Sequence, residues 1–493
     1  MTPQRTALKS PGLPGIPLAQ LCALLLIPTA LLVITGFQQG WPDGWDAWLS
    51  GHITMAWQGE GRLLKDAGLT AVIAAMGWLY WRHSQCWLNQ PDRPVSLRRI
   101  LMSILPGLLL LTLVVPFHSS DLYGYINRGV QQAVFHVNPY LVTVGQMSGW
   151  QDNPLFHEHW VFNPSPYGFV FTRLADGIAR LSPDHFTGIF LSFKLLNVLV
   201  FLLTLHAVWR LTTILKPAHN HPRLAAALTG FSPVLWLHLI GNGHNDLLMT
   251  LLLLWSLLAL FSRQKTWLCL PLLLLSVLIK YASLLALPFI LIRLIRLRAW
   301  RALLTGSLIA IMFFIAFAAG YWPQAGEHWP LAQMGGNASM SQHSLHSALS
   351  RAVYYFGLMF GQDWLAAARG FFKALLWGLF AAFYGWQLVR FWRHSRQTQS
   401  AEALVQTIAL VLLAMVAFAS SKFHGWYTGM FLPLTFCLPV TSRLFRFAYA
   451  FSLVQLLAFT PLENLHVLNA LLFLGLPLWF SLRPAGRAQP HQA

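Results

Sequence analysis

Apolar segments separated by short polar connections run along almost the whole chain. Many approach the ~20 residues that a helix needs to cross a bilayer, and several shorter ones occur in pairs. They lie at residues 17–37, 67–81, 100–116, 186–214, 224–240, 247–262, 267–280, 281–297, 302–320, 371–391, 402–420, 427–440, 447–460 and 466–482. The pattern predicts an all-α, polytopic membrane protein with about 12–14 transmembrane helices. For 267–280 and 281–297, a broken or re-entrant element is the alternative.

The composition agrees with a membrane protein. Of the 493 residues, 56% are hydrophobic and only 10% are charged, whereas a soluble protein of this size needs a far more charged surface. The net charge of +18 raises the question of nucleic acid binding. The basic residues, however, form short clusters between apolar segments, which is typical of residues that set membrane orientation. We therefore expect the lipid bilayer as a partner and no nucleic acid.

The basic clusters fall in alternate connections. They comprise Arg82, Arg93, Arg98, Arg99, Lys216, Arg223, Arg263, Lys265, Arg293, Arg296, Arg298, Arg301, Arg390, Arg393, Arg396, Arg443, Arg446, Arg483 and Arg487. The positive-inside rule then places both termini in the cytoplasm. The opposite, extracytoplasmic face receives two long loops, 117–185 and 321–370, in which we expect short amphipathic helices such as the one over Phe169–Leu181.

Three regions follow from this organisation. Residues 1–99 hold N-terminal spans and a cytoplasmic loop, residues 100–440 form the membrane core that carries the unusual polar motifs, and residues 441–493 hold the last spans. The polar tail after Arg483 is predicted to be disordered.

Two charges at the apolar segments are the most informative residues of the chain. Asp246 closes the polar turn that begins at Gly241, and Lys280 lies within the apolar stretch 268–292. A charge at membrane depth costs at least about 2.5 kcal/mol, so such residues usually face a watery cavity or a partner. For Lys280 the structural alternative is snorkelling to the interface. For the turn, Asn242, His244 and Asn245 add further polar groups, which favours a site.

The third apolar segment is followed by Ser119-Ser120-Asp121, with Asp121 beginning a predicted helix. Asp121 could merely complement the helix dipole, with Ser119 or Ser120 as the cap. Alternatively, it is a carboxylate at the membrane boundary that takes a proton from a hydroxyl group. Tyr125 and Arg128 share its helical face. Arg128 either binds a phosphate or pairs with Asp121.

Other aromatic and polar motifs lie on the same predicted face. The Pro164–Gly168 turn carries Tyr167, and the segment Lys422–Tyr427 offers a cation, an imidazole and two aromatic rings. Proline-rich turns commonly close loops, and aromatic residues form belts at any membrane boundary. Each motif is therefore weak alone, whereas their convergence on one face indicates a site.

These motifs resemble the GT-C superfamily of polyprenyl-phosphate-sugar-dependent glycosyltransferases, and most closely the bacterial alpha-1,6-mannosyltransferases. The resemblance rests on Ser-Ser-Asp-Leu-Tyr-Gly-Tyr from Ser119, Asn138-Pro139-Tyr140, Pro164–Gly168, Gly243–Asp246, Lys280-Tyr281 and Phe423–Tyr427, and it covers residues 100–440. Where family members often carry proline, this chain has Phe169 and Gly425.

The resemblance implies a GT-C fold in the inner cell membrane and an extracytoplasmic active site. That site would move a hexose, in the first place mannose, from a polyprenyl-phosphate-linked donor to a hydroxyl of a glycan or glycolipid acceptor, by inverting displacement. Asp121 matches the general base. The expected residues around the donor phosphate are Lys280, His244, Arg128, Lys422 and His424. Those expected around sugar and acceptor are Tyr123, Tyr125, Asn138, Tyr140, Tyr167, Asn242, Asn245, Asp246, Trp426 and Tyr427.

No cofactor is required by this chemistry, because the leaving phosphate can be stabilised by fixed cations. A divalent cation, Mg or Mn, bridged by Asp121 and Asp246 is the alternative. Among other functions, a transporter or flippase of lipid-linked sugars predicts internal repeats and charges at the bilayer centre. A polysaccharide polymerase or ligase predicts arginines in the large outer loop. The chain shows no obvious repeat, and its charged motifs lie at the ends of spans.

Overall fold

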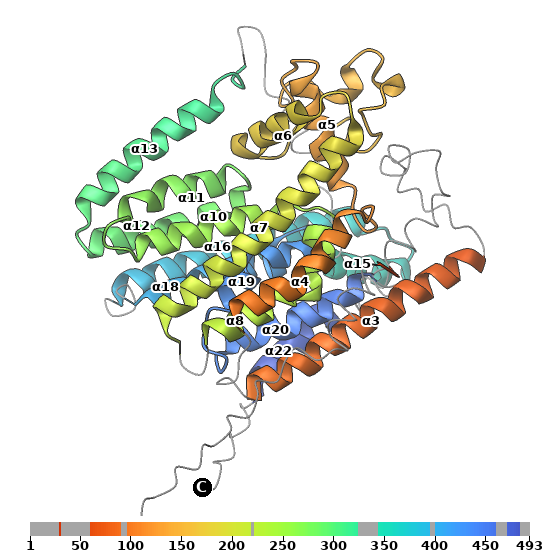
Figure 1. The fold of residues 1–493 in the computed structure, drawn as a ribbon. Coiled ribbons are helices and arrows are strands. Elements are labelled where there is room, and N and C mark those ends of the chain that lie inside the picture. Colours follow the sequence, from red (N-terminus) through yellow and green to blue (C-terminus); the bar gives the residue numbers. More distant parts are fainter. Residues whose placement is uncertain are drawn as a thin grey trace, which may run out of the picture.

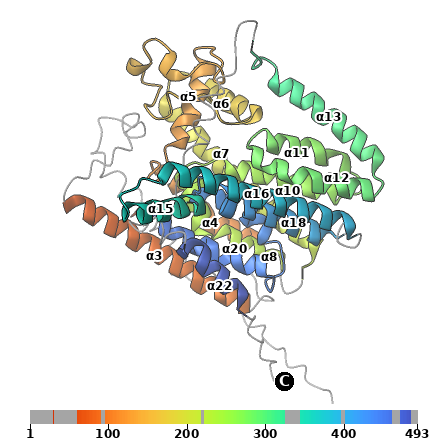
Figure 2. The ribbon, with the colours of Figure 1, turned by 180° about the vertical axis from the view of Figure 1, so that it is seen from behind.

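The computed structural model describes residues 29–30, 60–89, 96–217, 221–323, 344–394, 400–459 and 471–483. The expected span at 17–37, residues 324–343 of the 321–370 loop and the C-terminal tail after Arg483 lie largely or wholly outside the described residues. All elements within the described ranges are helical, which confirms the predicted all-α class. Figures 1 and 2 show a bundle of helices crossed by the long, steeply inclined α7, with α5 and α6 gathered at one end.

The regular helices are α3 Glu60–Asn89, α4 Leu97–Thr112, α5 Asp121–Ala133, α6 Phe169–Leu181, α7 Phe186–Leu215, α8 Pro222–Gly230, α9 Pro233–Leu235, α10 Asp246–Leu260, α11 Cys269–Val277, α12 Leu287–Arg296, α13 Trp300–Ala318, α15 Leu345–Leu358, α16 Leu365–Arg393, α18 Ala401–Ala414, α19 Leu432–Thr435, α20 Arg443–Val454 and α22 Leu476–Leu482. Between them lie the 3-10 turns η1 Val144–Gln146, η2 Trp150–Asp152, η4 Thr266–Leu268, η5 Tyr281–Ala286, η7 Gly425–Met430 and η8 Gln455–Phe459, and the π-helical turns η3 Trp236–Gly241, η6 Met415–Ala419 and η10 Leu471–Gly475.

Four described helices are long and apolar enough to cross a membrane: α7, α13, α16 and the continuous stretch Ala401–Ala419. The pair Pro222–Gly230 and Pro233–Gly241, bent by 49°, makes a fifth span if it is counted as one. Only 11% of the apolar window in α13 and 17% of that in α16 is buried within the protein. Surfaces this apolar need lipid around them, so the protein is a polytopic membrane protein.

Several expected spans are broken rather than continuous. The stretch 267–297 divides into α11, η5 and α12, with Lys280 in extended backbone (φ −149°, ψ 126°) at the break, which confirms the broken element considered for this region. The expected span at 427–440 is instead built from η7 and the short α19, because Gly429 and Pro433 interrupt a regular helix. Such breaks leave backbone polar groups at depth, which is tolerated only where protein or a cavity surrounds them.

The long loop 117–185 contains two amphipathic helices, as predicted. α5 and α6 pack tightly against each other, since a Cβ at Gly129 would lie only 2.5 Å from the carbonyl oxygen of Ala175. Three further side chains of α5 donate to the backbone of the connecting loops: Asn127 to His157 and His159, Arg128 to Trp160, and Gln131 to Val142. These contacts give the loop a fixed shape beside the membrane bundle.

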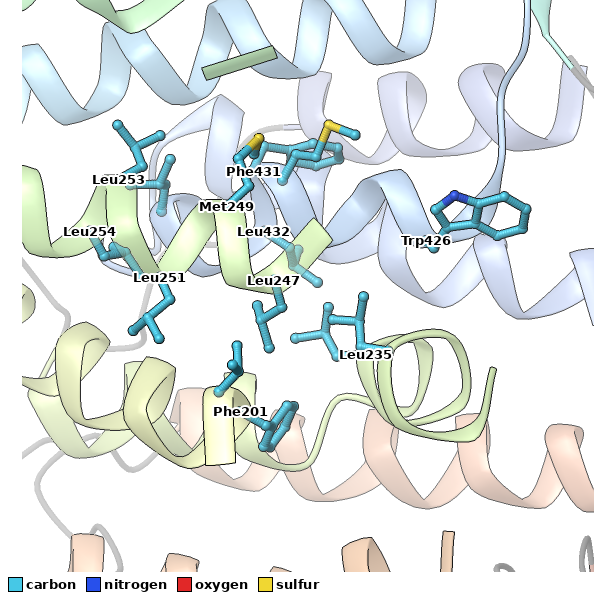
Figure 3. Close-up of a cluster of buried hydrophobic side chains, with 14 of the residues drawn as sticks. Phe201, Leu235, Leu247, Met249, Leu251, Leu253, Leu254, Trp426, Phe431 and Leu432 are labelled. Atoms are coloured by element: carbon cyan, nitrogen blue, oxygen red, sulfur yellow. The ribbon is translucent and has the colours of Figure 1, made fainter. Parts of the chain in front are cut away.

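α10 is a largely buried helix near this loop. Its leucines pack against Phe201 of α7, Leu235 of α9 and Phe431 beside α19, as Figure 3 shows. Such a helix, apolar all round, is held in place by neighbours on every side. Its N-terminus, where Asp246 lies, is therefore a rigid support for polar side chains.

Candidate active site

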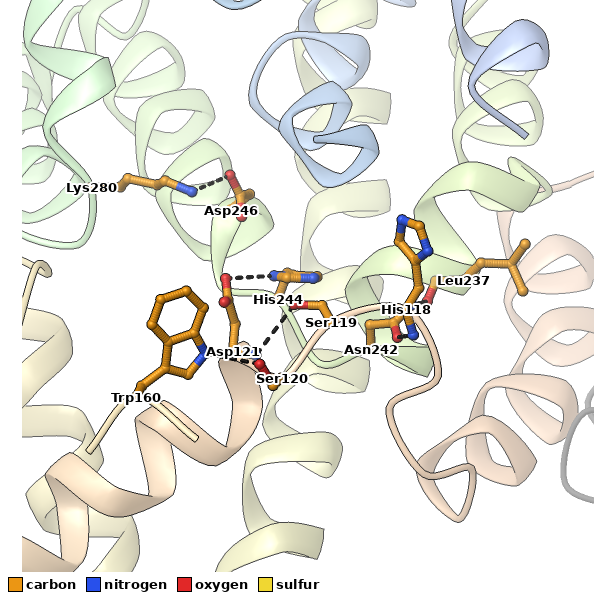
Figure 4. Close-up of polar contacts among 10 residues, drawn as sticks. All are labelled: His118, Ser119, Ser120, Asp121, Trp160, Leu237, Asn242, His244, Asp246 and Lys280. Atoms are coloured by element: carbon orange, nitrogen blue, oxygen red, sulfur yellow. Dashed lines mark hydrogen bonds and ion pairs between the residues drawn. The ribbon is translucent and has the colours of Figure 1, made fainter. Parts of the chain in front are cut away.

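Asp121 stands at the start of α5 with its carboxylate directed away from the helix. The N-cap residue is Ser120, whose side chain makes no capping hydrogen bond and instead accepts from the indole of Trp160 at 3.0 Å. The Oγ of Ser119 accepts from the backbone N–H of Asp121 at 3.2 Å. The Asp121 carboxylate therefore does not serve as the cap. It lies 3.4 Å from Nδ1 of His244 and keeps 20% of its side-chain surface exposed (Figure 4).

The turn that carries His244 is held against the segment before α5. Oδ1 of Asn242 accepts from the backbone N–H groups of Phe117 and His118, at 2.9 and 2.8 Å, and its Nδ2 donates to the Leu237 carbonyl. Gly243 adopts φ +78°, a conformation that favours glycine, and packs closely on Leu122. The turn thereby places His244 opposite Asp121.

A second ion pair lies beside the first. Nζ of Lys280 donates to Oδ1 of Asp246 at 2.6 Å, and it also lies 4.7 Å from the centre of the Tyr427 ring. The Asp246 side chain is only 1% exposed, whereas that of Lys280 is 23% exposed. Lys280 is therefore directed inward to a buried carboxylate rather than snorkelling away. Removing one partner of such a pair costs about 3–5 kcal/mol.

Trp426 is the aromatic centre of the site. The His244 ring stacks on it at 3.9 Å and 13°, and the His424 ring stacks at 4.1 Å and 4°. Two nearly parallel rings this close to the same centre would overlap on one face, so they must occupy opposite faces of the indole. Trp426 thus fixes the plane of His244 and connects it to the segment that carries Lys422.

The electrostatics favour an ionised Asp121. Burial raises the pKa of this carboxyl, but the close contact with His244 and the charges of His244, His424 and Lys280 outweigh burial, so its pKa lies below the usual value. Burial lowers the pKa of Lys422, and the negative charge of Asp121 partly opposes that effect. Asp121 therefore has the charge state that a proton acceptor needs.

The structure thus brings together Asp121, His244, Asp246, Lys280, His424, Trp426 and Tyr427, and it places Lys422 within electrostatic reach of Asp121. Tyr167 and Tyr125 lie at the edge of this group, with their rings edge to face at 5.1 Å. Burial is the main cause that raises the pKa of both phenols, and the negative charges of Asp121 and Asp246 raise it further. Both phenols therefore lie close to the two carboxylates.

Several other expected ligand-binding residues form hydrogen bonds to the protein backbone instead. Arg128 donates to the Trp160 and Asn163 carbonyls, and burial lowers its pKa to about 10. Asn138 and Tyr140 lie in a separate group. The Asn138 amide donates to the backbone carbonyl of Tyr321, and the Tyr140 hydroxyl donates to the backbone carbonyl of Tyr167. Tyr123 stacks on His157 at 3.9 Å. Asn242 fixes its turn by accepting a hydrogen bond from the backbone N–H of Phe117. Asn245 is buried, and its amide has no hydrogen-bond partner among the described residues.

Sequence reasoning missed His118 and His238, which extend the group of imidazoles. Their rings lie 5.6 Å apart, and His238 also lies 5.8 Å from Trp426. His238 explains the glycine at position 425, because a Cβ there would come within 2.2 Å of its Nε2. The signal for His238 was a lone ionisable residue inside the apolar stretch 224–240.

A largely apolar cavity of about 620 Å³ leads to Lys280. Its walls come from η5, α12, α16, η6 and η7: they include Tyr281, Leu284, Leu285, Leu287, Trp377, Phe380, Tyr384, Met415, Val416 and Met430. Tyr281, Leu284 and Trp377 are 53%, 49% and 43% exposed, so these walls reach the outer surface of the bundle. We call this cavity the Lys280 groove.

The residues present do not provide a ligand set for a resident metal ion. Among the described residues, no group of three or more His, Cys, Asp or Glu side chains is arranged to hold one. The two carboxylates that were considered as a bridge, Asp121 and Asp246, each already face a side-chain nitrogen, in His244 and Lys280. A bridging cation would have to displace both.

Sequence comparisons relate the chain to known mannosyltransferases. The family model of the alpha-(1->6)-mannopyranosyltransferase N-terminal domain matches residues 25–296, which is more than half of the chain. The chain is 28% identical over 137 residues to alpha-(1->6)-mannopyranosyltransferase B of Corynebacterium glutamicum, covering 27% of this chain and 22% of that protein. It is 24% identical over 183 residues to a probable alpha-(1->6)-mannopyranosyltransferase of Mycolicibacterium smegmatis, covering 36% and 31%.

The matched stretches thus span less than a third of either curated relative. No solved structure matches the chain. The family match extends over α3 to α12 and so includes Asp121, His244, Asp246 and Lys280. On the extent of that match, the chain belongs to the alpha-(1->6)-mannopyranosyltransferase family.

Proposed function

We propose that this protein transfers mannose from a polyprenyl-phosphate-linked donor to a hydroxyl of a glycan or glycolipid acceptor. The observation that carries this proposal is that Lys280, which pairs with Asp246, lines the apolar Lys280 groove and lies within electrostatic reach of Asp121, which in turn faces His244. A site that joins a carboxylate base, cations and a lipid-sized apolar wall suits a substrate with a phosphate, a sugar and a hydrocarbon chain.

The donor lipid fits the groove by its chemistry. Its phosphate would meet Lys280, and its hydrocarbon would lie along the leucine and aromatic wall toward the surface of the bundle. Each buried methylene group contributes about 0.8 kcal/mol, so a few isoprene units would hold the donor firmly. Asn245 and the rings of Tyr167 and Trp426 are the groups that we assign to sugar and acceptor.

The reaction is a single displacement. Asp121 accepts the proton of the acceptor hydroxyl as its oxygen bonds to C1 of mannose, and the bond from C1 to the phosphate oxygen breaks on the opposite face. The polyprenyl phosphate leaves with the bonding electrons. Lys280 and His244 stabilise its growing negative charge, with Lys422 and His424 contributing from the other side of Trp426. Inversion at C1 follows from the displacement.

The side of the membrane follows from the distribution of charge. The basic connections expected on the cytoplasmic side, such as those holding Arg263 and Arg301, lie at the far ends of the helices from the site. We therefore assign the site to the extracytoplasmic face of the inner membrane, with both termini in the cytoplasm.

A donor panel tests the proposed function. Purified protein in liposomes is given polyprenyl phosphate carrying mannose, glucose or arabinose, together with an oligomannoside acceptor, and the released lipid phosphate and extended glycan are measured. We expect consumption of the mannose donor with matching product. Consumption of another sugar would correct the donor, and movement of intact donor across the bilayer without transfer would establish a flippase instead.

A further inference from the structure

Lys194 is a buried cation that the site described above does not use. It lies within α7, a span of mean hydropathy 2.1, and its side chain has no exposed surface. Its ammonium donates to three backbone carbonyls, those of Leu111 at 3.3 Å, Ile240 at 2.6 Å and Gly241. An ammonium has three protons, so all of its donors are used.

The three carbonyls belong to the ends of two helices. Leu111 lies in the last turn of α4, and Ile240 and Gly241 are the last residues of η3. The last carbonyls of a helix lack partners within it and carry partial negative charge, so a cation there is favourable. Burying an ammonium is costly, and three charge-assisted hydrogen bonds offset that cost. Lys194 thus joins the ends of α4 and η3.

Each joined end leads directly into the site. From α4 the chain passes through Phe117 and His118 to Asp121, and from η3 it passes through Asn242 and Gly243 to His244. The hydrogen bonds of Asn242 to the N–H groups of Phe117 and His118 join the same two segments one step nearer the site (Figure 4). Lys194 and Asn242 are therefore two successive ties between the segments that carry the Asp121–His244 pair.

We propose that Lys194 is a positioning residue of the transfer reaction, which sets Asp121 against His244 by holding together the helix ends from which both segments depart. The inference rests on the proposed function and deepens it. It differs from a purely stabilising role in one respect. Loss of the tie should alter the pairing of Asp121 and His244 in protein that is still folded.

The decisive comparison uses Lys194→Met, which keeps the length of the side chain and removes its donors. Thr204→Val is the matched control, since it removes a buried hydrogen bond of the same helix that closes locally on the Val200 carbonyl. For Lys194→Met we expect kcat to fall about 100-fold with a KM for the donor within a few-fold of wild type, because small displacements of reacting groups are costly. Thr204→Val should keep wild-type kcat.

The pH profile separates positioning from plain stability. The groups that act on the Asp121 carboxyl are His244, His424 and Lys280, with Lys422 nearby. Loosening the tie should move the acid limb of kcat/KM to higher pH, and adding Lys194→Met to His244→Ala should change that limb no further. If the acid limb of Lys194→Met is not shifted, or if its kcat per folded molecule equals that of wild type, Lys194 only stabilises the fold.

Two further measurements keep the outcome decisive. If Lys194→Met does not accumulate in membranes, Lys194→Gln, which retains two donors without the charge, takes its place. If wild-type protein uses no lipid-linked sugar, the proposed function fails. Thermal unfolding then tests separately whether Lys194 holds the ends of α4 and η3 together. The Tm of the double variant Lys194→Met with Asn242→Ala is compared with those of the two single variants. A loss of Tm in the double variant that is smaller than the sum of the two single losses would support the tie, and a loss equal to that sum would overturn it.

Discussion

Four side chains form the two pairs of the candidate site, and each was visible in the sequence as a polar residue out of place. Asp121, His244, Asp246 and Lys280 stand at the ends or breaks of apolar stretches. Their pairing was not predictable, because Asp246 and Lys280 are 34 positions apart and meet only through the packing of α10 on α11. Lys194, also a lysine inside an apolar stretch, was missed because no polar motif surrounds it in the sequence and its partners are backbone carbonyls.

Asp121→Asn should abolish sugar transfer while leaving the fold intact. Asparagine keeps the shape of the side chain but cannot accept the proton, so we expect kcat to fall by about 10²–10⁴-fold. The measurement is product formation per folded protein in liposomes, with the donor KM determined in parallel. Asp152→Asn, at an exposed carboxylate of the same loop, is the control. Near-normal turnover by Asp121→Asn would remove Asp121 from the role of base.

His244→Ala should shift the pH dependence of transfer in a defined direction. His244 is the main influence that lowers the pKa of Asp121 against the opposing effect of burial. Without it the pKa rises, so Asp121 becomes protonated at higher pH and the acid limb of kcat/KM moves upward. The profile is measured between pH 4 and pH 8, roughly the range where carboxyl and imidazole groups titrate. A limb that stays in place would show that His244 does not act on Asp121.

At the scale of the elements, the breaks between helices matter more than the helices. Sequence periodicity located most apolar segments correctly, but it did not show that 427–440 is divided between η7 and α19. It also did not show how the Pro164–Gly168 turn docks. Backbone N–H groups of Gly168, Val170 and Phe171 donate to the carbonyls of Ile279 and Leu278, immediately before Lys280. Backbone contacts of this kind join segments that are distant in the sequence, and they produce no periodic pattern of hydrophobic residues.

Gly168→Ala should disturb the site from this docking contact. A Cβ at position 168 would lie 2.3 Å from the carbonyl oxygen of Leu278, so the turn must move away from the segment that holds Lys280. We expect a loss of about 1–3 kcal/mol in stability and a raised KM for the donor. Gly177→Ala on α6, where a Cβ meets nothing within 4 Å, should be neutral or stabilising. Thermal unfolding and donor titration check both, and equal behaviour of the two variants would contradict the docking argument.

For the whole molecule, composition and charge were sufficient to predict a polytopic, all-α membrane protein. They could not reveal the Lys280 groove, whose walls come from parts of the chain between residues 166 and 430. Nor could they show that α16, with most of its apolar surface outside the bundle, forms one side of that groove. A cavity is a property of packing, and segments are packed by contacts that hydropathy does not encode.

Ala282→Phe should narrow the groove and discriminate against long donors. Ala282 lines the groove beside Lys280, and the added ring would displace hydrocarbon from the wall. Loss of about two buried methylene groups corresponds to about a tenfold higher KM. Donors carrying full-length and truncated polyprenyl chains are compared, and the increase is expected only for the long one. The control is Ala316→Phe, on the exposed surface of α13. An equal increase for both chain lengths would show that the lipid lies elsewhere.

The Asp246–Lys280 pair has a consequence for substrate selection. In the resting protein the cation that would receive the donor phosphate is already neutralised by a carboxylate at 2.6 Å, so the mouth of the groove presents little net attraction to small anions in solution. Lys280, which is partly exposed, can share its remaining protons with a phosphate only after hydrophobic anchoring has brought that phosphate close. Recognition would then proceed in order: the hydrocarbon chain binds in the groove first, and the phosphate contacts Lys280 second. Water-soluble phosphates, which lack the hydrocarbon chain, would be excluded before the transfer reaction begins.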